Sequence, residues 1–134
     1  MYRILCDSFV LYDPRLPDLF VFEPELSQKK NEPGGLTFTI PKEHPNYGVL
    51  EKLKSRIKVY RDDTLIWVGR AIEDDRDLYE NRKVIAEGAL SFLLDSVLRP
   101  FTFDGTVTEL FTWILTAHNT QVNENQKLTL GNCD

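Results

Sequence analysis

The chain has 134 residues, a length that suits one folded domain, or one domain and the start of a second. It is 42% hydrophobic and 28% charged, and this composition excludes a disordered chain. Its formal net charge of -5 and its scattered lysines and arginines disfavour nucleic-acid binding, which needs a concentrated basic face. No stretch approaches the ~20 apolar residues of a membrane span and the first residues lack the pattern of a secretion signal. We therefore expect a protein made in a reducing cytoplasm, with no membrane segment.

The first 40 residues predict short strands separated by turns. Four segments are rich in aromatic or β-branched residues and are bounded by Asp, Pro or Gly: residues 3–6, 9–12, 19–22 and 36–40. The stretch 24–35, PELSQKKNEPGG, is polar and ends on a Pro-Gly-Gly turn signal, so we expect an exposed loop there.

A short helix and a hairpin are predicted next. Pro45 suits the first position of a helix, and Tyr47, Leu50 and Leu53 recur every three residues after it. The runs 57–60 and 65–68 then flank the polar turn RDDT, which predicts a β-hairpin with Trp67 as a core residue. A further strand is expected over residues 82–88, after an acidic linker at 73–77.

The last third of the chain predicts helices. An apolar run follows residue 89, with Ser91 as a candidate helix cap. Thr106-Val-Thr-Glu109 has the capping-box pattern and begins the best predicted helix. One apolar face of that helix carries Val107, Leu110, Phe111, Ile114, Leu115 and His118, with Trp113 beside it. We expect this face to pack on a sheet or on a neighbouring chain, and residues 128–131, LTLG, to form a terminal strand.

The carboxylates and histidines do not predict a metal site. Asp74, Asp75 and Asp77 lack the glycine and closing glutamate of an EF-hand, so a solvated loop is the expected setting. The two histidines, His44 and His118, are too few for a histidine-based zinc site, and each has a structural explanation.

The cysteines and serines likewise predict no catalytic centre. Cys6 and Cys133 lie at opposite ends of the chain and can form one disulfide at most, so they exclude a disulfide scaffold or a paired-cysteine zinc site. Neither Ser91 nor Cys6 has the context of an activated nucleophile, and no glycine-rich stretch matches a phosphate-binding loop. We expect no catalytic, metal or cofactor residues.

Three ordered segments resemble the amino-terminal region of tail-hub proteins, the tail-associated lysin or prophage tail endopeptidase family of siphophages and prophages of Gram-positive bacteria. The segments read GGLTFTIPKEHPNYGVLEKLKSRIKVYRDDTLIWVGRAIEDDRD, EGALSFLLDSVLRPF and FDGTVTELFTWILTAHNTQV. The resemblance runs from about residue 36 to residue 131 and rests on several segments in order, not on one short motif.

The resemblance implies an α+β, mainly β fold: a small β-barrel-like phage tail-hub domain with short helices and one longer C-terminal amphipathic helix. It implies a hub domain over residues 1–100 and the beginning of a second, truncated hub domain over 101–134. It also implies a homotrimeric ring at the virion tail tip, which closes the tail tube and has the distal tail protein and the tape measure protein as partners. Family members that digest peptidoglycan carry that activity further towards the carboxy terminus, so no catalytic residue is carried over.

Under this hypothesis, subunit contacts come from the helix face and from a sheet edge near residues 82–88. The candidate interface residues on the helix are Val107, Leu110, Phe111, Trp113, Ile114 and Leu115. Two other classes of function stay open. One is a fragment of a tail-associated peptidoglycan hydrolase, and the other is a host-surface or carbohydrate-binding module with Tyr12, Tyr79 and Trp113 as candidate platforms.

Overall fold

The computed structural model describes residues 1–131 and divides into two compact units, Met1–Ala89 and Leu90–Asp134. Within the described residues the chain forms seven strands, one α-helix and two short 3-10 helices. The prediction of a mainly β chain with short helices is therefore confirmed. The assignment of residues 1–100 and 101–134 to two hub domains stays a prediction.

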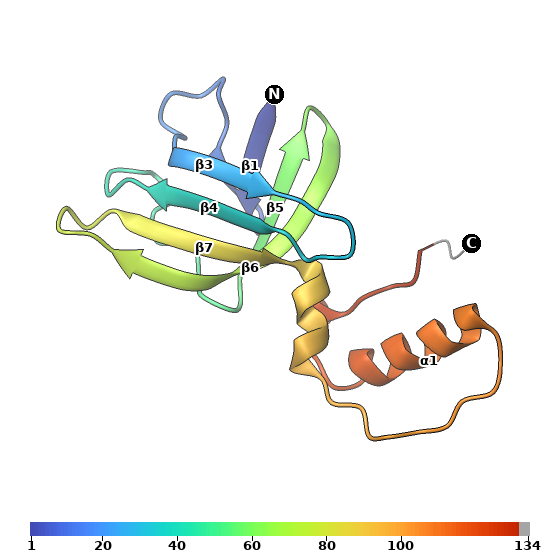
Figure 1. The fold of residues 1–134 in the computed structure, drawn as a ribbon. Helices are drawn as coiled ribbons and strands as arrows, with labels where there is room; N and C mark the ends of the chain where they lie inside the picture. The colour runs from blue at the N-terminus through green and yellow to red at the C-terminus, as the bar shows by residue number, and fades with distance from the viewer. Residues whose placement is uncertain (132–134) are drawn as a thin grey trace. The chain divides into compact units, whose positions relative to one another are not determined.

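The first unit is one antiparallel sheet that curls into a half-barrel (Figure 1). The order across the sheet is β2-β1-β5-β6-β7-β4-β3, so β2 and β3 are its two edges. The strands are β1 (Tyr2–Cys6), β2 (Phe9–Tyr12), β3 (Phe22–Ser27), β4 (Gly35–Ile40), β5 (Arg56–Arg61), β6 (Thr64–Arg76) and β7 (Arg82–Gly88).

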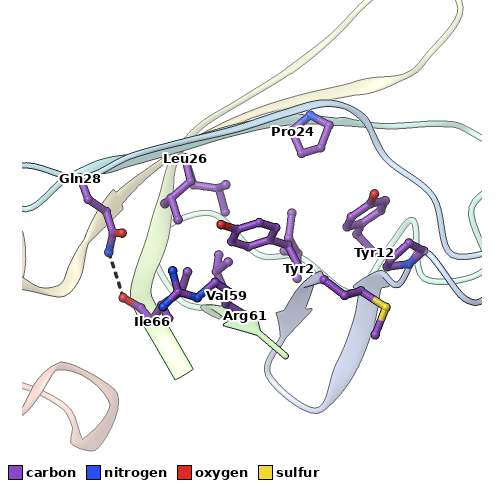
Figure 2. A pocket seen from close by; sticks show the side chains of 12 residues that line it. Tyr2, Tyr12, Pro24, Leu26, Gln28, Val59, Arg61 and Ile66 are labelled. Atoms are coloured by element: carbon purple, nitrogen blue, oxygen red, sulfur yellow. Dashed lines mark hydrogen bonds between the residues drawn. The ribbon is translucent and has the colours of Figure 1, made fainter. Parts of the chain in front are cut away.

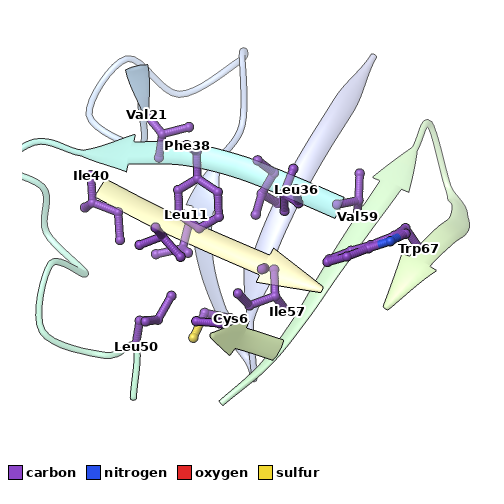
Figure 3. Close-up of a cluster of buried hydrophobic side chains, with 14 residues drawn as sticks. Cys6, Leu11, Val21, Leu36, Phe38, Ile40, Leu50, Ile57, Val59 and Trp67 are labelled. Atoms are coloured by element: carbon purple, nitrogen blue, oxygen red, sulfur yellow. The ribbon is translucent and has the colours of Figure 1, made fainter. Parts of the chain in front are cut away.

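The concave face of the sheet holds the hydrophobic core (Figure 3). In β4, Leu36, Phe38 and Ile40 are buried and alternate with half-buried residues, as expected for a strand with one face towards the core. Ile57 and Val59 of β5 follow the same alternation. Trp67 of β6 is only 6% exposed, which confirms its prediction as a core residue.

The strand predicted over residues 19–22 is wrong, as is part of the loop predicted over 24–35. The structure instead pairs β3 (Phe22–Ser27) with β4. The pairing uses backbone groups, so the polar side chains of β3 can face solvent at the edge of the sheet. Pro24 lies where the register shifts between Phe22 and Glu25, a position at which a strand tolerates the missing N–H.

The helix predicted after Pro45 is also wrong, because residues 42–54 form a series of turns. Polar side chains bind carbonyls of β2 here and compete with helical hydrogen bonds. The ring of His44 bonds to the Leu11 carbonyl at 2.6 Å, and the Asn46 side-chain amide donates to the Val10 carbonyl at 2.8 Å. Leu53, with φ of 64°, lies in the left-handed region that a right-handed helix excludes.

The acidic linker predicted at 73–77 is mostly strand. β6 continues to Arg76, and its register shifts between Ala71 and Glu73. Beyond this bulge the Asp74 carboxylate pairs with Arg82, whose side chain is 5% exposed. A solvated loop is therefore the wrong setting for Asp74, because the buried guanidinium needs an opposite charge.

Two glycines allow Trp67 and a neighbouring loop to pack closely on the end of the sheet. A Cβ on Gly88 would lie 1.6 Å from the carbonyl oxygen of Pro33, and one on Gly69 would lie 2.1 Å from that of Glu87. The Trp67 indole N–H donates to the Pro33 carbonyl at 3.4 Å. Any side chain at either glycine would push these segments apart.

We predict that Gly88→Ala destabilises the chain by about 1–3 kcal/mol or more, because the added methyl overlaps backbone that must then move. The measurement is urea unfolding followed by tryptophan fluorescence. Gly48→Ala is the matched control, since a Cβ there meets nothing within 4 Å. Equal unfolding free energies for the two variants would contradict the packing described.

Candidate interaction surfaces

The two edge strands are the first candidate surface. The outer sides of β2 and β3 pair with no strand among residues 1–131, so their backbone N–H and C=O groups are open to a partner. The hypothesis of a sheet edge near residues 82–88 is wrong, because β7 lies inside the sheet between β6 and β4. Edge contacts can come only from β2 and β3 in this unit.

A structured loop connects the two edges. The Asp13 carboxylate accepts hydrogen bonds from the Arg15 backbone N–H at 3.0 Å and from its guanidinium at 3.0 and 2.7 Å. The Arg15 side chain, followed by its backbone N–H, lowers the pKa of Asp13 to about 2. The Asp13 N–H donates to the Leu19 carbonyl at 3.1 Å, so Asp13 ties the beginning of the loop to a point near its end.

A hollow of about 680 Å³ lies on the concave side of the sheet, where β1 begins (Figure 2). Its floor includes the buried side chains of Ile4, Leu36 and Val59. Tyr2 projects into it from β1 and Leu26 from β3 on the opposite side. A volume of this order is typical of sites that hold a ligand or a few side chains, and the lining combines apolar side chains with polar groups, among them Gln28 and Arg61.

The turn between β6 and β7 is the third surface, at the other end of β6. The Asp77 carboxylate accepts from the backbone N–H groups of Tyr79 at 2.8 Å and of Asn81 at 3.0 Å. Desolvation raises the pKa of Asp77, but the hydrogen bonds from Asn81 and Tyr79 outweigh it and hold the pKa below its ordinary value. The turn thus keeps an anion at its base and leaves Leu78 and Tyr79 in solvent.

Helix α1 (Val107–Asn119), in the second unit, carries the predicted interface residues. The capping box is confirmed: Thr106 Oγ1 accepts from the Glu109 N–H at 3.2 Å, and the Glu109 carboxylate accepts from the Thr106 N–H at 2.8 Å. Val107 is 65% exposed. Phe111 and Trp113 are also exposed, while Leu110, Ile114 and Leu115 are half-buried.

Further apolar side chains are exposed in the second unit. Trp113 packs against Phe101 with ring centroids 4.3 Å apart, so the two form one aromatic pair at the surface. Leu94, in the 3-10 helix η1 (Ala89–Asp95), and Val97 are more than three-quarters exposed, at 83% and 77%. The candidate interface residues therefore belong to a wider apolar surface than the helix face alone.

The remaining chemistry-bearing side chains have structural partners. His118 is buried and bonds to the Ser96 hydroxyl at 2.8 Å and the Gln126 carbonyl at 2.9 Å. Burial raises the pKa of the Cys6 thiol to about 11, which keeps the thiol protonated at neutral pH. Cys133 lies outside the described residues, and so does any disulfide to it.

Across residues 1–131, no three His, Cys, Asp or Glu side chains gather where they could hold a metal ion. In that same part of the chain, no helix is both long and apolar enough to cross a membrane. The predicted strand at residues 128–131 is wrong, because this segment forms no sheet pairing. It is tied to α1 instead, through the Leu128 backbone and the Asn119 side chain.

Neither a protein-family model nor a curated protein matches this chain. The tail-hub resemblance therefore rests on the three sequence segments, and the assignment is a proposal.

We predict that Arg15→Ala raises the pKa of Asp13 from about 2 towards its ordinary value of 3.8, because the variant loses the side-chain hydrogen bonds and the opposite charge. Asp13 has a depressed pKa when folded, so its stabilising contribution is present above about pH 4 and is lost as the pH falls towards 2. A carbon-13 NMR titration of the Asp13 carboxyl group measures the shift. An unchanged titration would contradict the role of Arg15.

Proposed function

We propose that this chain is a structural subunit of a bacteriophage or prophage tail tip, where three copies form a ring that closes the tail tube. The ring docks on the distal tail protein and lies next to the tape measure protein. The proposal assigns the chain no catalytic step. Its role is assembly, through surfaces that are complementary to neighbouring subunits.

The observation that carries this proposal is the open half-barrel. Seven antiparallel strands curve strongly, yet the outer sides of both edge strands pair with no strand among the described residues. Open edges invite pairing with another chain, and soluble monomers usually cover or shorten them. Pro24 and the register shift protect only part of β3. A sheet of this form is suited to completion by neighbouring subunits.

The second unit supports the same proposal. Val107, Phe111, Trp113, Phe101 and Leu94 all expose large apolar side chains. Interfaces between subunits have an apolar centre that is rich in aromatic residues. A surface of this composition is more typical of a subunit contact than of a face that stays in water.

We expect light scattering to give the mass of a trimer when the purified chain is measured over a wide concentration range. Ile114→Asp should lower the fraction of trimer, because it places a charge on the half-buried helix face, and circular dichroism should show an unchanged sheet. Thr112→Asp, at an exposed position of the same helix, is the control. A monomer at every concentration would contradict a ring formed by this segment. If Ile114→Asp leaves the trimer unchanged, the helix face is not a subunit contact.

A second candidate function is binding to the host surface, and the hollow favours it. Tyr2 and Tyr12 line the hollow together with the polar groups of Gln28 and Arg61, and aromatic rings beside polar groups can hold a sugar ring. If the chain has this function, we expect intact cell walls to retain the wild-type chain in a pull-down and not to retain the Tyr12→Ala variant. A peptidoglycan hydrolase would instead release soluble fragments from purified cell wall.

A further inference from the structure

The tip of the β6–β7 hairpin holds two apolar side chains in solvent. Leu78 is 98% exposed and Tyr79 is 80% exposed. We call these two residues the knob. A mobile loop can fold such side chains back onto the protein, but this turn is fixed by its hydrogen bonds.

Lys42 and Tyr47, both from the segment before β5, hold the turn that carries the knob. Lys42 pairs with the Glu80 carboxylate at 2.8 Å, and its backbone N–H donates to the Asn81 side chain at 3.1 Å. The Tyr47 hydroxyl donates to the Glu80 carbonyl. Glu80 has φ of 64°, an unfavourable conformation for a residue with a side chain, so the surrounding contacts must stabilise it. The knob is thus presented in one conformation, which lowers the entropic cost of binding.

The hollow lies at the opposite end of the same strand. Ile66, near the start of β6, lines the hollow, whereas Arg76 ends β6 just before the knob. At about 3.3 Å per residue, Ile66 and Arg76 are roughly 30 Å apart along this strand. The knob therefore cannot reach the hollow of its own chain, although a second copy can bring the two together.

The two surfaces are complementary in polarity and charge. The hollow has a floor of aliphatic side chains and is walled by Tyr2 and Leu26. Arg61 brings a positive charge to its lining, and the Asp77 carboxylate stands beside the knob. Two apolar side chains with an adjacent carboxylate match a hollow that has an aliphatic floor and a guanidinium in its lining.

We propose that Leu78 and Tyr79 of one copy enter the hollow of the next copy, with Asp77 close to Arg61. This contact joins two different surfaces, so each copy offers one knob and one hollow. When this contact repeats from copy to copy, it closes into a ring if the rotation between neighbouring copies adds up to a full turn. The inference rests on the proposed ring and names the contact that builds it.

The test uses the whole 134-residue chain in sedimentation velocity, from micromolar to millimolar concentrations. The knob variant, Leu78→Ser with Tyr79→Ser, should weaken self-association about tenfold or more, since buried aromatic anchors dominate interfaces. Tyr2→Arg, at a half-exposed position, should do the same by placing a charge in the hollow. The control is Leu16→Ser with Leu65→Ser, two exposed leucines that belong to neither edge strand and do not line the hollow. Circular dichroism checks that every variant is folded.

Mixing the two variants gives the decisive result. Each lacks a different half of the contact, so a mixture should form a one-to-one complex and nothing larger at concentrations where each variant alone is monomeric. A trimer that survives the knob change rejects this contact and leaves the proposed ring intact. A wild-type chain that stays monomeric rejects both the contact and a ring formed by this segment. If the control variant weakens association as much as the knob variant, the contact is also rejected.

Discussion

The guanidinium of Arg82 is buried inside the first unit and binds two separate segments. It pairs with the Asp74 carboxylate on β6, and it donates to the carbonyls of Tyr47 and Leu50 in the turns before β5. A buried charge without partners is very costly, so these groups must stay in place whenever the sheet is folded. Because Arg82 and Asp74 lie close to the hairpin tip, the same cluster fixes the base from which Leu78 and Tyr79 project.

At the opposite end of β6, close packing and not an ion pair holds the strand in place. Trp67 lies against Gly69 and Gly88, and the Pro33 carbonyl occupies the space where a side chain on Gly88 would stand. These contacts hold the start of β4 and the end of β7 beside β6. The long strand therefore joins a polar anchor at one end to an apolar anchor at the other. Because the strand is fixed at both ends, the hollow and the exposed tip keep their positions at those ends.

The second unit is stabilised by different interactions. Helix α1 begins with local hydrogen bonds between Thr106 and Glu109, and it ends near the buried His118, which binds Ser96 and Gln126. These polar contacts hold the helix within its unit, but Val107 and Phe111 remain exposed. A helix draws most of its stability from burial of its apolar face. The unit thus has a defined local structure and an apolar surface that is suited to a partner.

The sequence predicted the elements whose signals are local. The capping box at Thr106, the hairpin of β5 and β6, and the strand β7 follow from the spacing of their own residues, and Trp67 was predicted as core. Helical periodicity predicted the apolar face of α1 with Trp113 beside it, and all six candidate interface residues there are exposed or half-buried, while their role in a contact stays a prediction. Short-range patterns suffice where backbone hydrogen bonds form within one element or between adjacent strands.

Only the tertiary structure decided the remaining features, because their partners are distant in sequence. β3 is a strand because β4 offers it backbone partners, although Glu23, Glu25 and Ser27 make half of it polar. The turns around His44 and Asn46 replace a helix because their side chains bind β2, more than thirty residues earlier. Asp74 is a structural ion-pair partner because Arg82 is buried opposite it. The hollow combines side chains from β1 to β6, so no segment of the sequence alone could indicate it.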